Sequence, residues 1–353
     1  MSVEAYIIQV NSNIVDALEA INENARGVVY VCDGMKLKGV VTDGNVRRHI
    51  MKGGQIDVNV RELMNATPRY LMHSDETDPY EFMEKAGITS LPILNNDFEI
   101  VSIKFLHASA IHATHDLDVP VVIMAGGKGT RLLPLTQVIP KPLVTIDDRT
   151  ITEMIMDQFM QFGCNDFNMI VNYKKALIKA FFSEYEDEYQ VSFTDEDEFM
   201  GTGGGIKLLQ GKYDDSFFLT NCDILVEEDY GDILKKHKKD NDIITIVCAI
   251  KKFTVPYGTV EMDEKGCVAC FKERPSQTHM VNTGLYIIHP RFLDYIPENT
   301  FIHITQVIEK CIANGEKVGV YPIQEGNWWD MGQMTELEKM RQRFQRRKDN
   351  SGG

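Results

Sequence analysis

Val119-Pro120-Val121-Val122-Ile123-Met124 runs directly into Ala125-Gly126-Gly127-Lys128-Gly129-Thr130-Arg131-Leu132, and this stretch decides the fold of the chain. The first half is a short apolar run, which predicts a buried parallel strand. The second half is a glycine-rich loop at the carboxyl end of that strand, where open α/β sheets bind their ligands. We therefore expect an α/β fold with a ligand site at this loop.

The loop has the composition of a phosphate site. Glycines let the backbone approach a phosphate and turn its N–H groups toward it. Arg131 and, slightly further on, Lys141 in Pro140-Lys141-Pro142-Leu143 add fixed positive charge. A Walker A loop would place Ser or Thr directly after Lys128, and a Rossmann fingerprint would need a third glycine after Gly127-Lys128-Gly129. The pattern therefore predicts a polyphosphate site of another kind.

From Ala125 to Leu143 the chain resembles the signature of the sugar-1-phosphate nucleotidyltransferases, AGGxGTRLxPLTxxxPKPL. This is the family of glucose-1-phosphate thymidylyltransferase and mannose-1-phosphate guanylyltransferase. Further motifs of that family follow in order: Glu198 to Gly204, Asn221-Cys222-Asp223, Tyr257-Gly258, Glu273-Arg274-Pro275, Asn282-Thr283-Gly284 and Trp329 to Gly332. The resemblance implies a Rossmann-like catalytic domain with a mixed, mainly parallel sheet over residues 116–348.

The resemblance also implies roles for the matching residues. Arg131 would steady the β- and γ-phosphates, Lys141 would hold the attacking sugar-1-phosphate, and Asp223 would share a Mg²⁺ ion with Asp330. Magnesium typically takes one or two carboxylates, with phosphate oxygens and waters completing its shell. The implied nucleotide-binding residues are Ala125, Gly126, Gly127, Gly129, Thr130, Glu196, Glu198, Gly201 and Thr202. The implied sugar-phosphate-binding residues are Tyr257, Gly258, Glu273, Arg274, Asn282 and Thr283.

The prediction of which nucleotide base is bound depends on Glu196. Uridylyl and thymidylyl members of the family resemble one another in having Gln five residues before the Gly of the Gly-Thr pair, and Glu196 stands at that position here. A carboxylate only accepts hydrogen bonds, and guanine offers adjacent N1–H and N2–H donors, so Glu favours GTP. The alternative is that Asp195-Glu196-Asp197-Glu198 is a solvated acidic run. Uridylyl or thymidylyl transfer to another hexose-1-phosphate then stays open.

The first hundred or so residues predict a separate unit that repeats itself with a period of roughly 62 residues. A helix at 14–21 and strands at 27–32 and 37–41 are matched by a helix at 80–87 and strands at 90–94 and 100–103. This order resembles a tandem pair of CBS modules, which we assign to residues 1–115. The resemblance implies that Thr42-Asp43 holds the ribose of a regulatory nucleotide. Alternatively, the pair serves only oligomerisation and Thr42 merely caps a helix.

A CBS pair joined to this transferase looks similar to bacterial guanylyltransferases that feed amino-sugar or heptose precursors into nonulosonate and surface-glycan pathways. Glucosamine-1-phosphate is then the expected acceptor. Two alternatives belong to other classes: a catalytically silent nucleotide-sensing regulatory protein, and a retaining glycosyltransferase using Asp195-Glu196-Asp197 as its metal motif. The retention of Arg131, Lys141, Asp223 and Asp330 together favours the active transferase.

The composition of the chain limits the classes of partner that it is expected to bind. The formal net charge of -15 argues against nucleic acid or an anionic membrane, so local cations and a metal must attract the anionic ligand. Seven cysteines without framework spacing are typical of a reducing cytoplasm. The segment Met1 to Val10 lacks the basic flank of a secretory signal. We expect a cytoplasmic homo-oligomer with a flexible tail at 349–353.

Overall fold

The computed structural model describes residues 3–24, 26–75, 77–106, 116–185 and 189–341. The chain divides into two compact units. The first comprises Met1–Ala113, Ile250–Val281 and Pro322–Gly326, and the second comprises Thr114–Ala249, Asn282–Tyr321 and Asn327–Gly353. The predicted boundary at 115/116 adjoins residues outside the described part of the chain, and the predicted tail at 349–353 lies outside it as well.

The first unit contains the same arrangement twice. Its first copy consists of β1 (Ile7–Gln9), α1 (Ile14–Asn24), β2 (Val28–Asp33), β3 (Lys36–Thr42) and α2 (Asp43–Met51), with 3-10 turns at η1 (Val3–Tyr6) and η2 (Val60–Glu62). Its second copy consists of β4 (Leu71–Met72), α3 (Pro79–Ala86), β5 (Ser90–Leu94) and β6 (Ile100–Phe105). In each copy the first strand pairs parallel with the second, and the second pairs antiparallel with the third. The repeat of roughly 62 residues is therefore confirmed.

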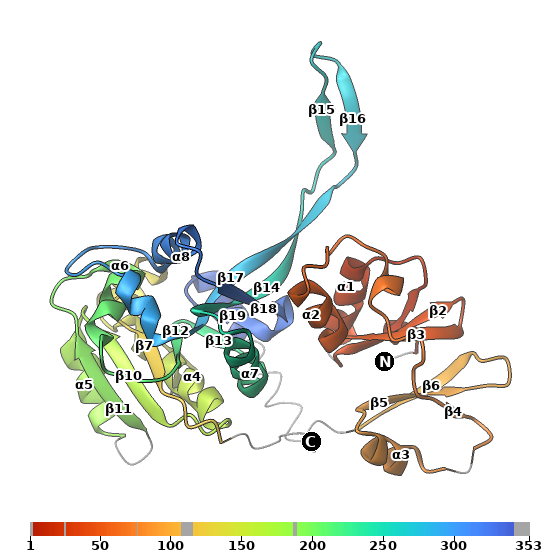
Figure 1. The fold of residues 1–353 in the computed structure, drawn as a ribbon, viewed down its shortest axis with the longest axis horizontal. Coiled ribbons are helices and arrows are strands. Elements are labelled where there is room, and N and C mark those ends of the chain that lie inside the picture. The colour runs from red at the N-terminus through yellow and green to blue at the C-terminus, as the bar shows by residue number, and fades with distance from the viewer. Residues whose placement is uncertain (1–2, 25, 76, 107–115, 186–188, 342–353) are drawn as a thin grey trace. The chain divides into compact units, whose positions relative to one another are not determined.

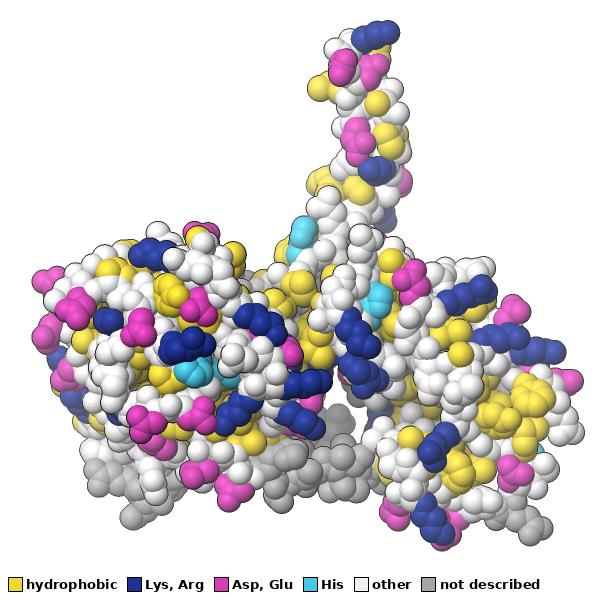
Figure 2. Space-filling view, viewed as in Figure 1, with side chains coloured by type: hydrophobic (Ala, Val, Ile, Leu, Met, Phe, Trp, Pro, Cys, Tyr) yellow, Lys and Arg dark blue, Asp and Glu magenta, His cyan; other side chains and the backbone are white. Residues whose placement is uncertain are grey.

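Hydrophobic periodicity explains this arrangement. Along α1, Ile14, Leu18 and Ile21 fall on one face and are buried against Val29 and Val31 of β2. Two further strands grouped with this unit, β15 (Thr259–Met262) and β16 (Val268–Lys272), pair with each other as a hairpin. Hydrophobic side chains lie exposed along that hairpin (Figure 2).

Within the described residues, the second unit is built on a seven-stranded sheet in the order β11-β10-β7-β12-β17-β14-β18. The strands are β7 (Val121–Met124), β10 (Asp166–Val171), β11 (Gln190–Asp195), β12 (Phe217–Asn221), β14 (Ile244–Thr254), β17 (Ser276–Ile288) and β18 (Val318–Gln324). The pairs β11–β10, β10–β7 and β7–β12 are parallel, and β12 pairs antiparallel with β17. The mixed, mainly parallel sheet is confirmed.

Helices cover this sheet (Figure 1): α4 (Ile151–Met160), α5 (Lys175–Ser183), α7 (Tyr230–Asp240) and α8 (Ile304–Ala313). Short elements fill the connections: β8 (Thr145–Ile146), β9 (Arg149–Thr150), α6 (Gly201–Gly204), β13 (Ile224–Val226) and β19 (Trp328–Asp330), with 3-10 turns η4 (Thr130–Leu132), η5 (Leu135–Gln137), η6 (Lys141–Leu143), η7 (Gly205–Leu209), η8 (Pro290–Tyr295) and η9 (Glu325–Asn327). Val121, Val122 and Ile123 are fully buried and β7 pairs parallel with β10 and β12, which confirms the predicted buried parallel strand. None of the helices in the described ranges has the length and apolar character that a membrane span requires.

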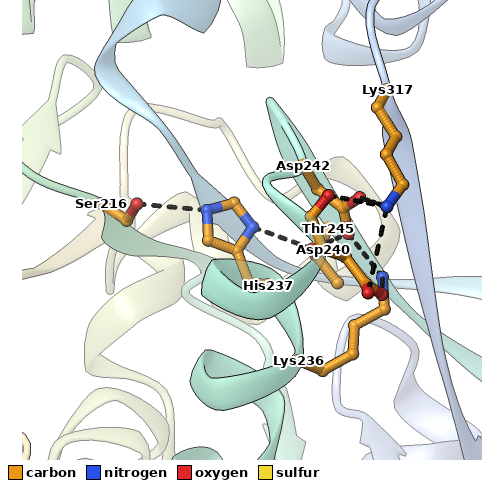
Figure 3. A network of polar contacts seen from close by, with 7 residues as sticks. All are labelled: Ser216, Lys236, His237, Asp240, Asp242, Thr245 and Lys317. Carbon is orange, nitrogen blue, oxygen red and sulfur yellow. Dashed lines mark hydrogen bonds and ion pairs between the residues drawn. The ribbon is translucent and has the colours of Figure 1, made fainter.

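A buried polar network fastens α7 to the sheet (Figure 3). The two ring nitrogens of His237 bond the hydroxyl oxygens of Ser216, at 3.1 Å, and Thr245, at 2.9 Å. Asp242 accepts a hydrogen bond from Thr245 and forms ion pairs with Lys236 and Lys317. Burial lowers the pKa of His237 to about 4, so its imidazole is neutral at neutral pH.

Candidate functional site

A pocket of about 180 Å³ lies at the carboxyl ends of β7, β11 and β12 in the second unit. Its position follows from the topology, because parallel strands bring the loops at their carboxyl ends to one edge of the sheet. The lining residues are Met124, Gly126, Gly127, Gly129, Arg131, Lys141, Glu196, Phe199, Thr202, Asn221, Cys222 and Asp223. The structure thus brings together in one pocket eight of the predicted site residues.

The signature loop is shaped by close packing at two glycines. A Cβ at Gly126 would lie 2.7 Å from Glu196 Oε2, so no side chain fits there. Gly129 has φ +65°, and a Cβ there would lie 2.9 Å from Thr136 Cγ2. The Thr136 hydroxyl donates to the Gly129 carbonyl at 2.8 Å. This hydrogen bond fixes the conformation of the loop that contains Arg131 and precedes Lys141.

Arg131, Lys141, Asp223 and Asp330 meet at one place. The Lys141 ammonium forms an ion pair with Asp223 Oδ2, and Arg131 Nη2 lies 3.8 Å from the same oxygen. A Cβ at Gly332 would lie 2.3 Å from Asp223 Oδ2, 2.9 Å from Asp330 Oδ1 and 3.1 Å from Arg131 Nη2. Two carboxylates that are far apart in the sequence therefore share one small space with two cations.

The pairing of two short strands produces this convergence. β13 and β19 are antiparallel, and Ile224 is the direct partner of Asp330. Since Asp223 immediately precedes Ile224, both aspartates reach the same edge of the sheet. Among the described residues there is no group of three or more His, Cys, Asp or Glu side chains that could hold a metal ion. Two carboxylates fit a Mg²⁺ ion, which keeps substrate oxygens and waters as its other ligands.

Lys141 stays charged in spite of its burial. Burial by itself would lower the pKa of Lys141, but the neighbouring Cys222 and Asp223 together raise it above the ordinary value for lysine. Burial also raises the pKa of the Cys222 thiol to about 12. The pocket therefore presents a fixed ammonium beside a neutral thiol, and the ammonium can bind a phosphate.

Glu196 is the buried member of the acidic run. Only 1% of its surface is exposed, whereas Asp195, Asp197 and Glu198 are exposed. Its Oε1 accepts a hydrogen bond from Met200 N at 2.8 Å, and its Oε2 has no hydrogen-bond partner in the part of the chain that the structure describes. Burial raises the pKa of Glu196. The interpretation of this whole run as a solvated face is therefore wrong for Glu196, which lines the pocket and has one buried carboxylate oxygen without a hydrogen-bond partner among the described residues.

The other predicted nucleotide-binding residues lie around this pocket. Thr202 lines it, and its hydroxyl oxygen accepts from Ile304 N at the start of α8. Ala125 is buried at the end of β7, and Gly201 has φ +79° at the start of α6. Ala125, Thr130, Glu198 and Gly201 are absent from the lining formed by the described side chains.

The predicted sugar-phosphate residues fall into two groups. Asn282 and Thr283 lie on β17 in the second unit, next to Gly284, where a Cβ would lie 2.4 Å from the side chain of the pocket residue Asn221. Tyr257, Gly258, Glu273 and Arg274 belong to the hairpin region of the first unit. Gly258 and Glu273 are neighbours there, since a Cβ at Gly258 would lie 3.1 Å from Glu273 Oε2. Two of the six residues thus belong to the second unit and four to the first.

Asn172, Phe199 and Asn221 lie around the pocket and are not among the predicted site residues. Asn172 follows β10, and its Nδ2 donates to the Glu196 carbonyl at 2.8 Å. Phe199 and Asn221 line the pocket directly. Asn172 and Asn221 each follow or end a parallel strand, and this position is the signal that would have found them. No periodic pattern marks Phe199.

A larger cavity, of about 640 Å³, lies in the first unit. Thr42 and Asp43 line it together with three arginines, Arg26, Arg48 and Arg69. Thr42 also caps α2, since its hydroxyl oxygen accepts from Asn45 N at 3.3 Å. Capping does not exclude ligand binding, because the backbone and the Asp43 carboxylate still line the cavity.

Comparisons with known proteins agree with these features. A family model described as nucleotidyl transferase matches residues 120–347. The mannose-1-phosphate guanyltransferases of Aspergillus fumigatus and Candida albicans are 33% and 32% identical over 221 residues, which cover 60% of this chain and 60% of each relative. The chain thus spans about 60% of the length of the curated relatives it matches. The crystal structure of HddC from Yersinia pseudotuberculosis matches 64% of this chain and 99% of its own, with a TM-score of 0.51 and 23% identity, which shows the fold alone.

Proposed function

This chain belongs to the nucleotidyl transferase family, and from that premise we propose that it joins GTP to glucosamine-1-phosphate, giving an NDP-sugar and pyrophosphate. The observation that carries the proposal is the meeting of Arg131, Lys141, Asp223 and Asp330 beside the glycine loop. Phosphoryl and nucleotidyl transfer needs little covalent help from a protein; it needs aligned reactants and charge placed around phosphorus. These four side chains offer that charge.

In the proposed reaction a phosphate oxygen of the sugar-1-phosphate attacks the α-phosphorus of the triphosphate. The bond between the α-phosphorus and the bridging oxygen breaks, and pyrophosphate leaves with that electron pair. Arg131 stabilises the charge of the β- and γ-phosphates, and Lys141 holds the sugar phosphate against the α-phosphate. No general base is needed, because a sugar phosphate is already ionised at pH 7.

Asp223 and Asp330 are the residues that would hold Mg²⁺. The bound ion would neutralise phosphate charge as a Lewis acid. In the absence of substrates, Lys141 and Arg131 compensate the buried Asp223 carboxylate. The same Asp223 oxygen would have to leave the Lys141 ammonium in order to coordinate a metal ion.

Glu196 supports guanine as the base. Glu196 lines the pocket, and its buried Oε2 lacks a hydrogen-bond partner among the described residues and lies against Gly126. A carboxylate that accepts from guanine N1–H and N2–H would satisfy that oxygen. The mannose-1-phosphate guanyltransferases among the relatives point to the same base. Uridylyl or thymidylyl transfer is the competing proposal, with a pyrimidine edge in place of guanine.

One experiment tests these proposals together. The full-length protein is incubated with Mg²⁺, each nucleoside triphosphate in turn and a panel of sugar-1-phosphates, and pyrophosphate release is followed. We expect release with GTP and glucosamine-1-phosphate. Release only with UTP or dTTP would overturn the base assignment, and release with no pair would favour the catalytically silent nucleotide sensor. Omitting Mg²⁺ or adding a chelator should abolish the signal.

For the first unit we propose a tandem CBS pair that binds a regulatory nucleotide in the 640 Å³ cavity through Thr42 and Asp43. Three arginines on the lining suit a phosphorylated ligand. The repeated strand topology of the first unit supports the assignment of a tandem pair. We further propose that the protein is a cytoplasmic homo-oligomer serving nonulosonate or surface-glycan precursor synthesis.

Calorimetric titration of the full-length protein with nucleoside mono-, di- and triphosphates tests the regulatory site. We expect two binding events for at least one nucleotide. Asp43→Ala combined with Arg48→Ala should remove one event and Glu196→Gln should leave that event in place. A single event that is insensitive to the double substitution would end this proposal.

A further inference from the structure

A row of aromatic rings borders the pocket of the second unit. Phe199 lines the pocket, yet 46% of its surface is exposed. Its ring lies 6.0 Å from that of Phe301 in a T-shaped contact, and Phe301 in turn lies 5.0 Å from His303. Phe301 is 57% exposed. Large half-exposed aromatic side chains at a pocket commonly contact a ligand, because water solvates their apolar faces poorly.

The row is held in place by backbone contacts between segments a hundred residues apart. Ile302 N donates to Met200 O at 3.0 Å, and Gly203 N and Gly204 N donate to Ile302 O at 2.9 and 3.1 Å. The glycines make this approach possible. A Cβ at Gly201 would lie 2.7 Å from Ile302 O, and a Cβ at Gly204 would lie 2.5 Å from Thr300 O. The glycine run after Met200 therefore serves to seat the segment that carries Phe301.

Phe199 and Glu196 belong to the same short loop. The loop is closed on itself, because Met200 N, directly after Phe199, donates to Glu196 Oε1. Glu196 and Phe199 therefore both line the pocket, Glu196 with a carboxylate oxygen that has no hydrogen-bond partner among the described residues and Phe199 with an apolar ring. Glu196 can bind only the hydrogen-bonding edge of a nucleotide base. The flat aromatic face of the base would still need an apolar surface to pack against.

We propose that Phe199 is the surface on which the purine base of the triphosphate stacks, and that Phe301 and His303 hold the Phe199 ring in position. This inference rests on the proposed nucleotide site and adds a second means of selection to it. Glu196 reads the edge of the base and distinguishes guanine, whereas stacking depends only on the size of the aromatic face and favours a purine over a pyrimidine. Phe199 is then a specificity residue, and Phe301 is a positioning residue.

Titration calorimetry of the full-length protein with GTP and Mg²⁺, without sugar phosphate, measures the stacking directly. Phe199→Leu should weaken GTP binding about tenfold, because a branched aliphatic side chain does not stack. Phe199→Tyr should stay within about twofold of the unchanged protein, because it keeps the ring. Phe301→Ala should weaken GTP binding by less than Phe199→Leu and by more than Phe199→Tyr. Phe181→Leu, an aromatic loss on α5 away from the pocket lining, is the matched control and should change nothing.

Inosine triphosphate separates this inference from the guanine assignment, because inosine lacks the N2 amine and keeps the purine face. Phe199→Leu should weaken both nucleotides by the same factor and leave their ratio unchanged. Glu196→Gln should reduce the preference for GTP over inosine triphosphate. If Glu196→Gln leaves that preference unchanged while Phe199→Leu still weakens both, stacking stands and the guanine assignment fails.

Two outcomes would overturn the stacking inference. The first is a GTP dissociation constant that Phe199→Leu leaves unchanged in a variant with the parent melting temperature. The second is a KM for the sugar-1-phosphate that rises while GTP binding does not change, which would place the ring against the acceptor. A parent protein that binds no nucleoside triphosphate would instead overturn the proposed function.

Discussion

At the scale of single residues, the pocket depends on where side chains are missing as much as on where they are present. Gly332 has two carboxylates and a guanidinium within 3.1 Å of the place where its Cβ would stand. Gly126 leaves room for the Glu196 carboxylate in the same way. The residues that carry charge are thus positioned by neighbours that carry no side chain, which makes these neighbours sensitive sites for substitution.

Gly332→Ala should reduce turnover without unfolding the protein. Its methyl group would displace Asp223 and Asp330, and displacing reacting groups by about 1 Å costs on the order of a hundredfold in rate. Pyrophosphate release and the melting temperature are measured in parallel. Gly326→Ala, whose new Cβ would meet only Asn22 Oδ1 at an ordinary 3.5 Å, is the control. Equal activity in the two variants would contradict the assigned geometry.

Arg131→Ala should lower kcat on the order of a thousandfold, because a cation that stabilises transferring phosphates contributes that much in comparable reactions. Arg291→Ala, an exposed arginine in η8, should have no effect. Steady-state pyrophosphate assays at saturating GTP check this. Turnover that survives the loss of Arg131 would remove the central element of the proposed mechanism.

At the scale of elements, α4 holds the segment that carries Lys141. The hydroxyl of Thr152, in the first turn of α4, donates to the Pro142 carbonyl at 2.8 Å, and Thr152 is fully buried. A capping box between Thr150 and Glu153 fixes the start of the same helix. The helix α4 therefore positions the segment that carries a predicted catalytic residue.

Thr152→Val should destabilise the protein by about 1–2 kcal/mol, because the change keeps the volume but leaves the buried Pro142 carbonyl without its donor. Denaturant unfolding measures the loss. Ser183→Ala removes a similar hydroxyl-to-carbonyl bond at an exposed place on α5, and it should cost close to nothing. The expected extra effect of Thr152→Val is a raised KM for the sugar phosphate, since Lys141 shifts with Pro142.

At the scale of the whole molecule, the chain consists of two units, and the family model covers residues that belong mainly to the second. The hairpin β15–β16 lies within the matched residues but is grouped with the first unit. The stability of the second unit depends on polar groups as well as on its apolar core. The buried His237 network joins α7 to residues at the starts of β12, β14 and β18.

Acid should weaken the fold through His237. Its pKa is about 4 in the folded protein and 6.5 in an unfolded chain, so the unfolded chain binds an extra proton between these values. The contribution of neutral His237 to the free energy of unfolding has its full value above pH 6.5. It falls by up to about 3 kcal/mol as the pH drops to 4. Melting temperatures of the parent and of His237→Gln between pH 7 and pH 4 check this, and the variant should show a shallower slope.

His289 is the control for that experiment. Burial also lowers its pKa, but it is less deeply buried, so His289→Gln should keep most of the parent slope. Slopes that are identical in the parent and in His237→Gln would contradict the role assigned to the network in Figure 3.

The local features of this protein can be predicted from residues that are close together in the chain. A run of apolar residues predicted the buried strand at 119–124, a period of roughly 62 residues predicted the repeated unit, and the dense motif from Ala125 to Leu143 predicted the family and the mixed, mainly parallel sheet. Each of these features depends on residues that are neighbours in the sequence, because periodicity and motif spacing follow from short-range backbone geometry.

Which distant residues meet becomes evident only in the folded chain. The pairing of Ile224 with Asp330 brings two aspartates together, and the packing against Gly126 buries Glu196 while its acidic neighbours stay exposed. The same holds for Phe301, which reaches Phe199 through backbone bonds to Met200 and Gly203. Burial and non-local pairing depend on the path of the whole chain, so no local pattern encodes them.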